Sequence, residues 1–161
     1  MTINQRVAIL IDGNNIEKSI QNSFGEKLLL KYEEFIEEII FDRSLTRFVY
    51  FREGIKISDK FATKLHKAFY GVTVSCNKSA DIPLTIEAVQ LCDKVDTIIL
   101  FSGDSDYIGL VKYLHSRGVR VEIAGVYSSI SKKLFDVVDN VTYITEKHCH
   151  YYEFDPNYKP E

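Results

Sequence analysis

Residues 97–106, TIILFSGDSD, join a nearly uninterrupted apolar run to a short polar segment that carries two aspartates. Such a run is typical of a strand that is buried on both faces of a parallel sheet. Two other stretches have the same form: VAILID at residues 7–12 and VTVSC at residues 72–76. In an open parallel sheet the carboxyl ends of the strands share one edge, and ligands bind there. If these strands are neighbours, the residues that follow them should gather at that edge.

Acidic residues follow all three stretches. Two carboxylates about 4 Å apart repel each other by roughly 4 kcal/mol at an effective dielectric constant of 20. We therefore expect at least one of them to have a raised pKa when no cation is bound. A cation would make the cluster tolerable, and hard oxygen ligands with open positions suit Mg²⁺ or Mn²⁺. The expected metal ligands and catalytic residues are Asp12, Asp81, Asp104 and Asp106.

Each aspartate also has an ordinary structural explanation. Asp81, Asp104 and Asp106 each stand where a helix is expected to begin, and Asp is a preferred N-cap residue. Asp12 precedes Gly13 and can form a turn. Independent caps need not all follow strands at one edge of a sheet, so the four residues together favour a metal site.

Strands and helices are expected to alternate along the whole chain, as their hydrophobic periodicity indicates. This order predicts an α/β fold, a three-layer α/β/α sandwich in which helices cover both faces of a central, mainly parallel sheet. The expected strands are residues 6–11, 47–52, 72–76, 96–101, 119–124 and 141–144. The expected helices are residues 16–21, 32–41, 58 or 59 to 69, 82–92, 106 or 107 to 116, and 129 or 131 to 137.

The chain has 161 residues, which suits one domain with a sizeable core. We expect that domain at residues 1–145 and a polar, aromatic C-terminal tail at residues 146–161. The net charge of −3 gives no global basic field, although a local patch can suffice to bind nucleic acid. The three cysteines lack zinc-ligand spacing, and their odd number without a signal peptide favours a cytoplasmic protein. No apolar run approaches the roughly 20 residues that cross a bilayer, so we expect no membrane partner.

Other phosphate chemistries lack their motifs in this chain. There is no G-x-x-x-x-G-K-[ST] loop, and no G-x-G-x-x-G follows the first strand. A haloacid-dehalogenase-like phosphatase would need a second Asp two residues after Asp12, where Asn14 stands. The G-x-S-x-G elbow of the α/β-hydrolases is also missing.

Three segments resemble those of NYN domains, the LabA-like branch of the PIN-like nuclease superfamily. They are the strand that ends in Asp12 with Asn15 after it, KSAD at residues 78–81, and FSGDSDY at residues 101–107. The resemblance covers nearly the whole chain up to residue 144. The family usually shows Lys-Gly-Val-Asp where this chain has KSAD, a change that leaves the Lys and the Asp in place.

The resemblance implies a PIN-like sandwich and metal-dependent endonucleolytic cleavage of RNA. One or two Mg²⁺ or Mn²⁺ ions at the aspartates would orient water, polarise the scissile phosphate and stabilise the leaving oxygen. We expect Asp12 and Asp104 to ligate directly. Asp81 and Asp106 could ligate directly, ligate through water, or activate the nucleophile. The acidic residue that the family often shows further along the same helix appears here as Glu87.

Several polar side chains are candidates for substrate binding. Asn15 and Ser102 could position the phosphate or a ligand water. Lys78 could pair with a phosphate oxygen or form a salt bridge that balances the acidic cluster. Lys60 and Lys64 fall on one stripe of an expected helix, which is either a solvated face or an edge that tracks phosphates toward the acidic centre.

These observations leave three functions open: a metal-dependent ribonuclease, an RNA-binding or regulatory module with little or no turnover, and a DNA-directed nuclease. The complete set of four aspartates favours the first, with single-stranded or loop RNA as partner. Tyr107 could stack a base of that RNA or pack inside the fold. Aromatic residues in the tail make a homodimer a further possibility.

Overall fold

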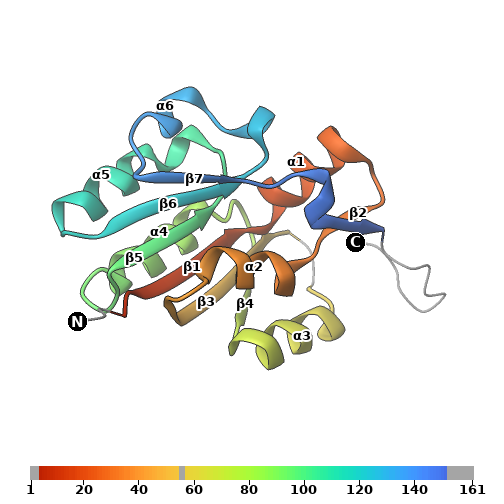
Figure 1. The fold of residues 1–161 in the computed structure, drawn as a ribbon, viewed down its shortest axis with the longest axis horizontal. Coiled ribbons are helices and arrows are strands. Elements are labelled where there is room, and N and C mark those ends of the chain that lie inside the picture. Colours follow the sequence, from red (N-terminus) through yellow and green to blue (C-terminus); the bar gives the residue numbers. More distant parts are fainter. Residues whose placement is uncertain (1–3, 55–56, 152–161) are drawn as a thin grey trace.

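The computed structural model describes residues 4–54 and 57–151, and its centre is a sheet of six parallel strands (Figure 1). The strands lie in the order β4-β3-β1-β5-β6-β7, and each neighbouring pair is parallel. Their bounds are β1 Arg6–Asp12, β3 Ser44–Glu53, β4 Val72–Cys76, β5 Thr97–Phe101, β6 Arg120–Gly125 and β7 Asn140–Tyr143. The aliphatic residues of β1 and β5 are almost completely buried, as central strands covered on both faces should be.

Helices on the two faces of the sheet form two separate parts of the core (Figure 1). One part contains side chains of α4, α5 and α6 together with Ala8 and Leu10. The other contains side chains of α1, α2 and α3 together with Ile9 and Ile11, because successive residues of a strand point to opposite faces. The helices are α1 Gly13–Phe24, α2 Tyr32–Ile40, α3 Asp59–Phe69, α4 Asp81–Leu91, α5 Ile108–Ser116 and α6 Lys132–Phe135, with short 3₁₀ helices η1 Ser105–Tyr107, η2 Tyr127–Ser129 and η3 Glu146–His148.

This architecture confirms the predicted fold class, a three-layer α/β sandwich around a parallel sheet. The proposed neighbourhood of the three acidic-ended strands is only partly correct. β5 lies next to β1, but β3 separates β4 from β1. The helix expected from residue 129 or 131 to 137 is found as the shorter α6, with Ser131 as its N-cap, and η2 precedes it.

Two short strands have no counterpart in the sequence-based prediction. β2 Leu28–Leu30 pairs antiparallel with β8 Cys149–Tyr151. A three-residue apolar run is too short for its periodicity to reveal a strand, and its partner lies more than a hundred residues away. Residues 146–151, which we expected in the tail, thus form η3 and β8 within the fold. Residues 152–161 of that tail lie outside the described residues.

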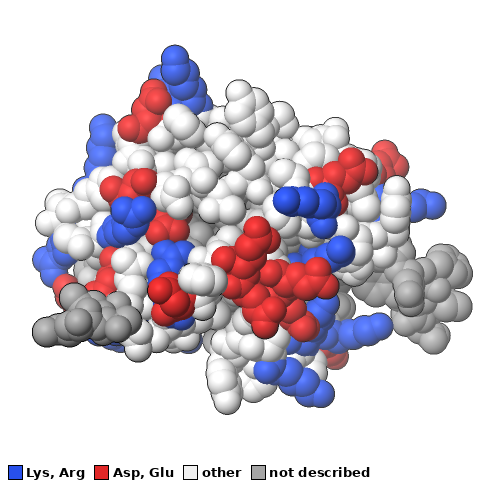
Figure 2. Space-filling model, in the orientation of Figure 1, with Lys and Arg blue, Asp and Glu red and all other residues white. Residues whose placement is uncertain are grey.

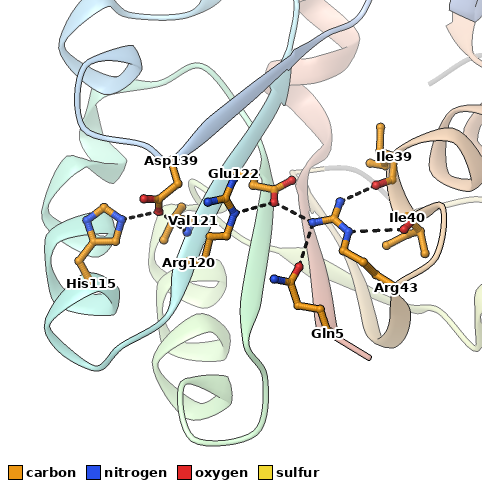
Figure 3. A network of polar contacts seen from close by, with 9 residues as sticks. All are labelled: Gln5, Ile39, Ile40, Arg43, His115, Arg120, Val121, Glu122 and Asp139. Carbon is orange, nitrogen blue, oxygen red and sulfur yellow. Dashed lines mark hydrogen bonds and ion pairs between the residues drawn. The ribbon is translucent and has the colours of Figure 1, made fainter. Parts of the chain in front are cut away.

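A polar network closes the end of the sheet opposite the aspartates (Figure 3). Glu122 of β6 is buried, and its Oε2 lies 2.7 Å from Arg43 Nη1 and 3.1 Å from Arg120 Nε. Arg43 also donates to Gln5 and to two carbonyl groups at the end of α2. A buried carboxylate needs such partners, so this network is explained by stability alone. No helix in residues 4–54 and 57–151 is long and apolar enough to span a membrane.

Candidate metal centre

Three carboxylates converge at the carboxyl edge of the sheet. Asp81 is the first residue of α4, Asp104 is the N-cap of η1, and Asp106 lies inside η1. One oxygen of each lies within 4.8 Å of the others. Although β4 is distant from β1 in the sheet, α4 packs against β1 and brings Asp81 back across the edge.

The turn after β5 is fixed by hydrogen bonds that involve two predicted site residues. Ser102 is fully buried, and its Oγ accepts a hydrogen bond from Asp104 N at 3.2 Å. Asn15 Oδ1 accepts one from Gly103 N, also at 3.2 Å. Asp104 Oδ1 in turn accepts one from Asp106 N at 2.9 Å. Asn15 and Ser102 therefore hold the turn that carries two of the carboxylates, and Asp104 is both a helix cap and a member of the cluster.

Asp12 lies beside this group of three and does not belong to it. It is buried, and its Oδ2 accepts a hydrogen bond from the Tyr107 hydroxyl at 3.1 Å. The same hydroxyl lies 3.2 Å from Asp81 Oδ1. Because a phenol has one proton, Tyr107 is a donor that the two carboxylates share.

The hypothesis that Tyr107 stacks a base is wrong. Its side chain is only 1% exposed, so the alternative of packing inside the fold is the correct one. Burial and the neighbouring carboxylates Asp12 and Asp81 raise the pKa of Tyr107, so the hydroxyl stays protonated and remains a donor at neutral pH.

Burial raises the pKa of Asp12 from its ordinary value of 3.8 to about 6. Hydrogen bonds from Tyr107 and from Asn15 N oppose this rise, and the charges of Asp81 and Asp104 add to it. The predicted rise in pKa for at least one of the four aspartates is found at Asp12. Its main cause, however, is burial rather than repulsion between carboxylates.

Asp12 should make the metal-free protein less stable as the pH rises. A raised pKa in the folded state means that folding favours the protonated form, so this contribution is complete below pH 3.8 and is lost as the pH rises through about 6. Between pH 4 and pH 7.5 the loss should be roughly 2 kcal/mol. Urea unfolding of wild type and of Asp12→Asn, both with chelator, gives the free energy of unfolding at each pH. The loss is the difference between the two proteins in how this free energy changes with pH. Identical pH dependences would contradict the raised pKa.

The structure leaves the predicted lysines outside this cluster. Lys78 is exposed and forms no ion pair with any residue in the described part of the chain, which removes the salt-bridge explanation there. Lys60 and Lys64 are exposed on α3, which covers the face of the sheet opposite α4 and α5. Glu87 pairs with Arg47 of β3 at 2.8 Å, so its carboxylate has a structural partner.

A compact acidic patch lies over α2, on the same face of the sheet as α3 (Figure 2). Its residues are the exposed glutamates Glu33, Glu34, Glu37 and Glu38. This patch repels a phosphate backbone, so it opposes RNA binding over α2, on the face of the sheet that α2 shares with α3.

Comparisons with known proteins agree with this geometry. The family described as NYN domain matches residues 6–145. The chain is 23% identical to the low amplitude and bright protein LabA of Synechococcus elongatus, over 83% of this chain and 81% of that protein. It is 24% identical to an uncharacterized protein of Methanocaldococcus jannaschii, over 88% of this chain and 56% of that longer protein. A solved structure of a protein of unknown function from Vibrio parahaemolyticus has the same fold, with a TM-score of 0.82 and 21% identity over 93% of this chain and all of that one.

Proposed function

Because the chain belongs to the NYN domain family, a family of PIN-like nucleases, we propose that it is a Mg²⁺- or Mn²⁺-dependent endoribonuclease of the cytoplasm. The observation that carries the proposal is the convergence of Asp81, Asp104 and Asp106 at the edge of the sheet. The substrate that we propose is single-stranded RNA or the loop regions of folded RNA.

The three carboxylates suit a hard divalent cation in chemistry and in spacing. Mg²⁺ binds oxygen ligands at about 2.0–2.1 Å, so two ligands on opposite sides of the ion are about 4 Å apart. Oxygens of the three carboxylates lie within 4.8 Å of one another, so rotation of the side chains would bring them around one ion. Their partial exposure leaves room for water and substrate.

In this proposal each residue of the centre has a separate task. Asp81, Asp104 and Asp106 would hold one or two divalent ions, whose charge would polarise a scissile phosphate, orient water and stabilise the leaving oxygen. Asp12, which we propose as a further ligand, also accepts a hydrogen bond from Tyr107, and the same hydroxyl orients Asp81. A carboxyl group with a pKa of about 6 can also exchange a proton at neutral pH.

Lys78 is the residue that we propose for a direct phosphate contact. It is exposed, it lies three residues before Asp81, and it has no ion pair among the described residues. A free ammonium group at this position can approach a phosphate oxygen without losing a protein partner. Asn15 and Ser102 contribute indirectly, through the turn that carries Asp104.

The test is cleavage of labelled single-stranded RNA, and of DNA of the same sequence, with Mg²⁺, with Mn²⁺ and with chelator. The double variant Asp81→Asn/Asp106→Asn, purified in the same way, controls for contaminating ribonuclease. We expect metal-dependent cutting of RNA by wild type only, and a rise in its melting temperature with metal that the double variant lacks.

Other outcomes would replace this proposal with one of its alternatives. Cutting of DNA but not of RNA would make the protein a DNA-directed nuclease. RNA binding that weakens with salt, without cutting under any metal condition, would indicate a binding module. If neither Mg²⁺ nor Mn²⁺ changes the melting temperature of wild type, the proposal of a metal centre is wrong.

A further inference from the structure

Two exposed tyrosines form a pair at the same edge of the sheet as the aspartates. Tyr127 is 75% exposed and Tyr143 is 37% exposed. Their ring centroids are 5.4 Å apart with an interplanar angle of 65°, an edge-to-face contact. This contact restrains both rings while most of the Tyr127 ring remains open to solvent.

Strand register places this tyrosine pair close to the turn that carries Asp104. Phe101 of β5 is paired with Ala124 of β6, so the residues after these strands leave the sheet side by side. Gly125 is paired with Tyr143 of β7. Neighbouring strands are about 4.8 Å apart, so the ends of β5 and β7 are separated by only about 10 Å.

The turn that carries Tyr127 is anchored to the metal centre by backbone contacts. Ser131 N donates to the carbonyl of Gly103 at 2.9 Å, and a Cβ at Gly103 would lie 2.2 Å from the carbonyl oxygen of Ser129. On its other side, Ser128 Oγ lies 2.9 Å from Ser23 Oγ of α1. The Tyr127 ring therefore projects from a rigid turn that is fixed relative to Asp104.

The charges around the tyrosine pair suit a nucleic acid. Lys132 and Lys133 begin α6, directly after this turn, and both are exposed. Neither forms an ion pair within residues 4–54 and 57–151. The acidic patch of α2 lies on the other face of the sheet from α6. An RNA strand that leaves the aspartates beside α6 would meet Lys132 and Lys133, whereas the α2 patch would repel RNA on the other face.

We propose that Tyr127, restrained by Tyr143, stacks an unpaired base of single-stranded RNA while the adjoining backbone passes the Asp81–Asp104–Asp106 cluster. The inference rests on the proposed function for the identity of that cluster. Every base offers a π-face, so this contact selects single strands over duplexes and has little sequence preference. It also assigns to Tyr127 the stacking role that the buried Tyr107 cannot perform.

The test measures binding without cleavage. Fluorescence anisotropy of a labelled twelve-nucleotide oligouridylate, with chelator present, measures the affinity of wild type, Tyr127→Ala and Tyr127→Trp. Tyr151→Ala is the matched control, because Tyr151 is also an exposed tyrosine, 69% exposed on β8. An abasic ribose-phosphate strand of equal length is the second probe. Tyr127→Ala should weaken oligouridylate binding about tenfold, Tyr127→Trp and Tyr151→Ala should keep it within about twofold, and binding of the abasic strand should not change.

Several results would overturn the stacking proposal while leaving the nuclease proposal to its own assay. The stacking proposal is wrong if Tyr127→Ala binds the oligouridylate as tightly as wild type does. It is also wrong if Tyr127→Ala weakens binding of the oligouridylate and of the abasic strand equally. A change from dimer to monomer in Tyr127→Ala, with RNA affinity retained, would assign the tyrosine pair to self-association. If Tyr127→Ala loses binding but metal-dependent cutting is never found, the stacking surface stands and the catalytic function fails.

Discussion

Asp104→Asn should cut RNA roughly 10²- to 10³-fold more slowly than wild type at saturating Mn²⁺, and its melting temperature should respond less to the metal. The substitution removes a charged ligand from the cluster, and a divalent ion contributes several kcal/mol of transition-state stabilisation. The fold should persist, because an Asn oxygen can still accept the hydrogen bond from Asp106 N that caps η1. Single-turnover cleavage and thermal unfolding across a Mn²⁺ titration measure the two effects.

Asp93→Asn is the matched control for this change of charge. Asp93 is an exposed carboxylate that pairs with Arg117 on the surface, outside the cluster. Its removal should leave both the cleavage rate and the metal response as in wild type, since surface ion pairs contribute little. If Asp104→Asn cuts RNA and gains stability with Mn²⁺ as wild type does, the cation binds elsewhere.

Gly103→Ala should destabilise the protein by about 3 kcal/mol and remove metal-dependent cleavage. A Cβ at this position would lie 2.2 Å from the carbonyl oxygen of Ser129, and backbone cannot yield as a flexible side chain can. The turn after β5 would have to move away from the neighbouring turn, and Asp104 would move with it. Denaturant unfolding should register the loss, with a fall in melting temperature of about 6–12 °C.

Gly109→Ala separates this steric effect from the general effect of losing a glycine. Gly109 lies in α5, and a Cβ there would meet no atom within 4 Å. Alanine at an open helical position should stabilise the protein by up to about 1 kcal/mol. If the Gly103→Ala variant is as stable as wild type, the turn that carries Asp104 can move away from the turn that carries Tyr127 at no cost. The claim that Tyr127 is held in a fixed position relative to Asp104 would then be wrong as well.

The site was predictable from the sequence where local chemistry decides it. The aspartates follow strand-like runs, and parallel strands end at one edge, so convergence of Asp81, Asp104 and Asp106 could be expected. Asp12 was expected at that edge too, and a raised pKa was expected in the group, but burial as its main cause was not. The burial of Asp12 comes from the packing around the sheet edge, and its hydrogen bond comes from Tyr107, which is 95 residues away and offered no periodic signal.

The substrate-binding residues show the same division. Asn15 and Ser102 lie within three residues of an aspartate in the sequence, and both hydrogen-bond within the turn that carries Asp104. Their hydrogen bonds go to backbone, which only the packing of α1 against that turn reveals. Lys60 and Lys64 form a stripe on α3 as the helical spacing predicts, but that spacing carries no information about which face of the sheet the helix covers.

The alternation of strands and helices follows from the sequence alone, because buried strands and amphipathic helices have local apolar patterns. That polar residues at strand ends share one edge follows from the sequence as well. Four features are visible only in the folded chain: the strand order with β4 outside β3, the β2–β8 pair, the hydroxyl that Asp12 and Asp81 share, and the contact of Tyr127 with Tyr143. These features join residues that are distant along the chain, and their free energy comes from burial and packing that no local pattern specifies.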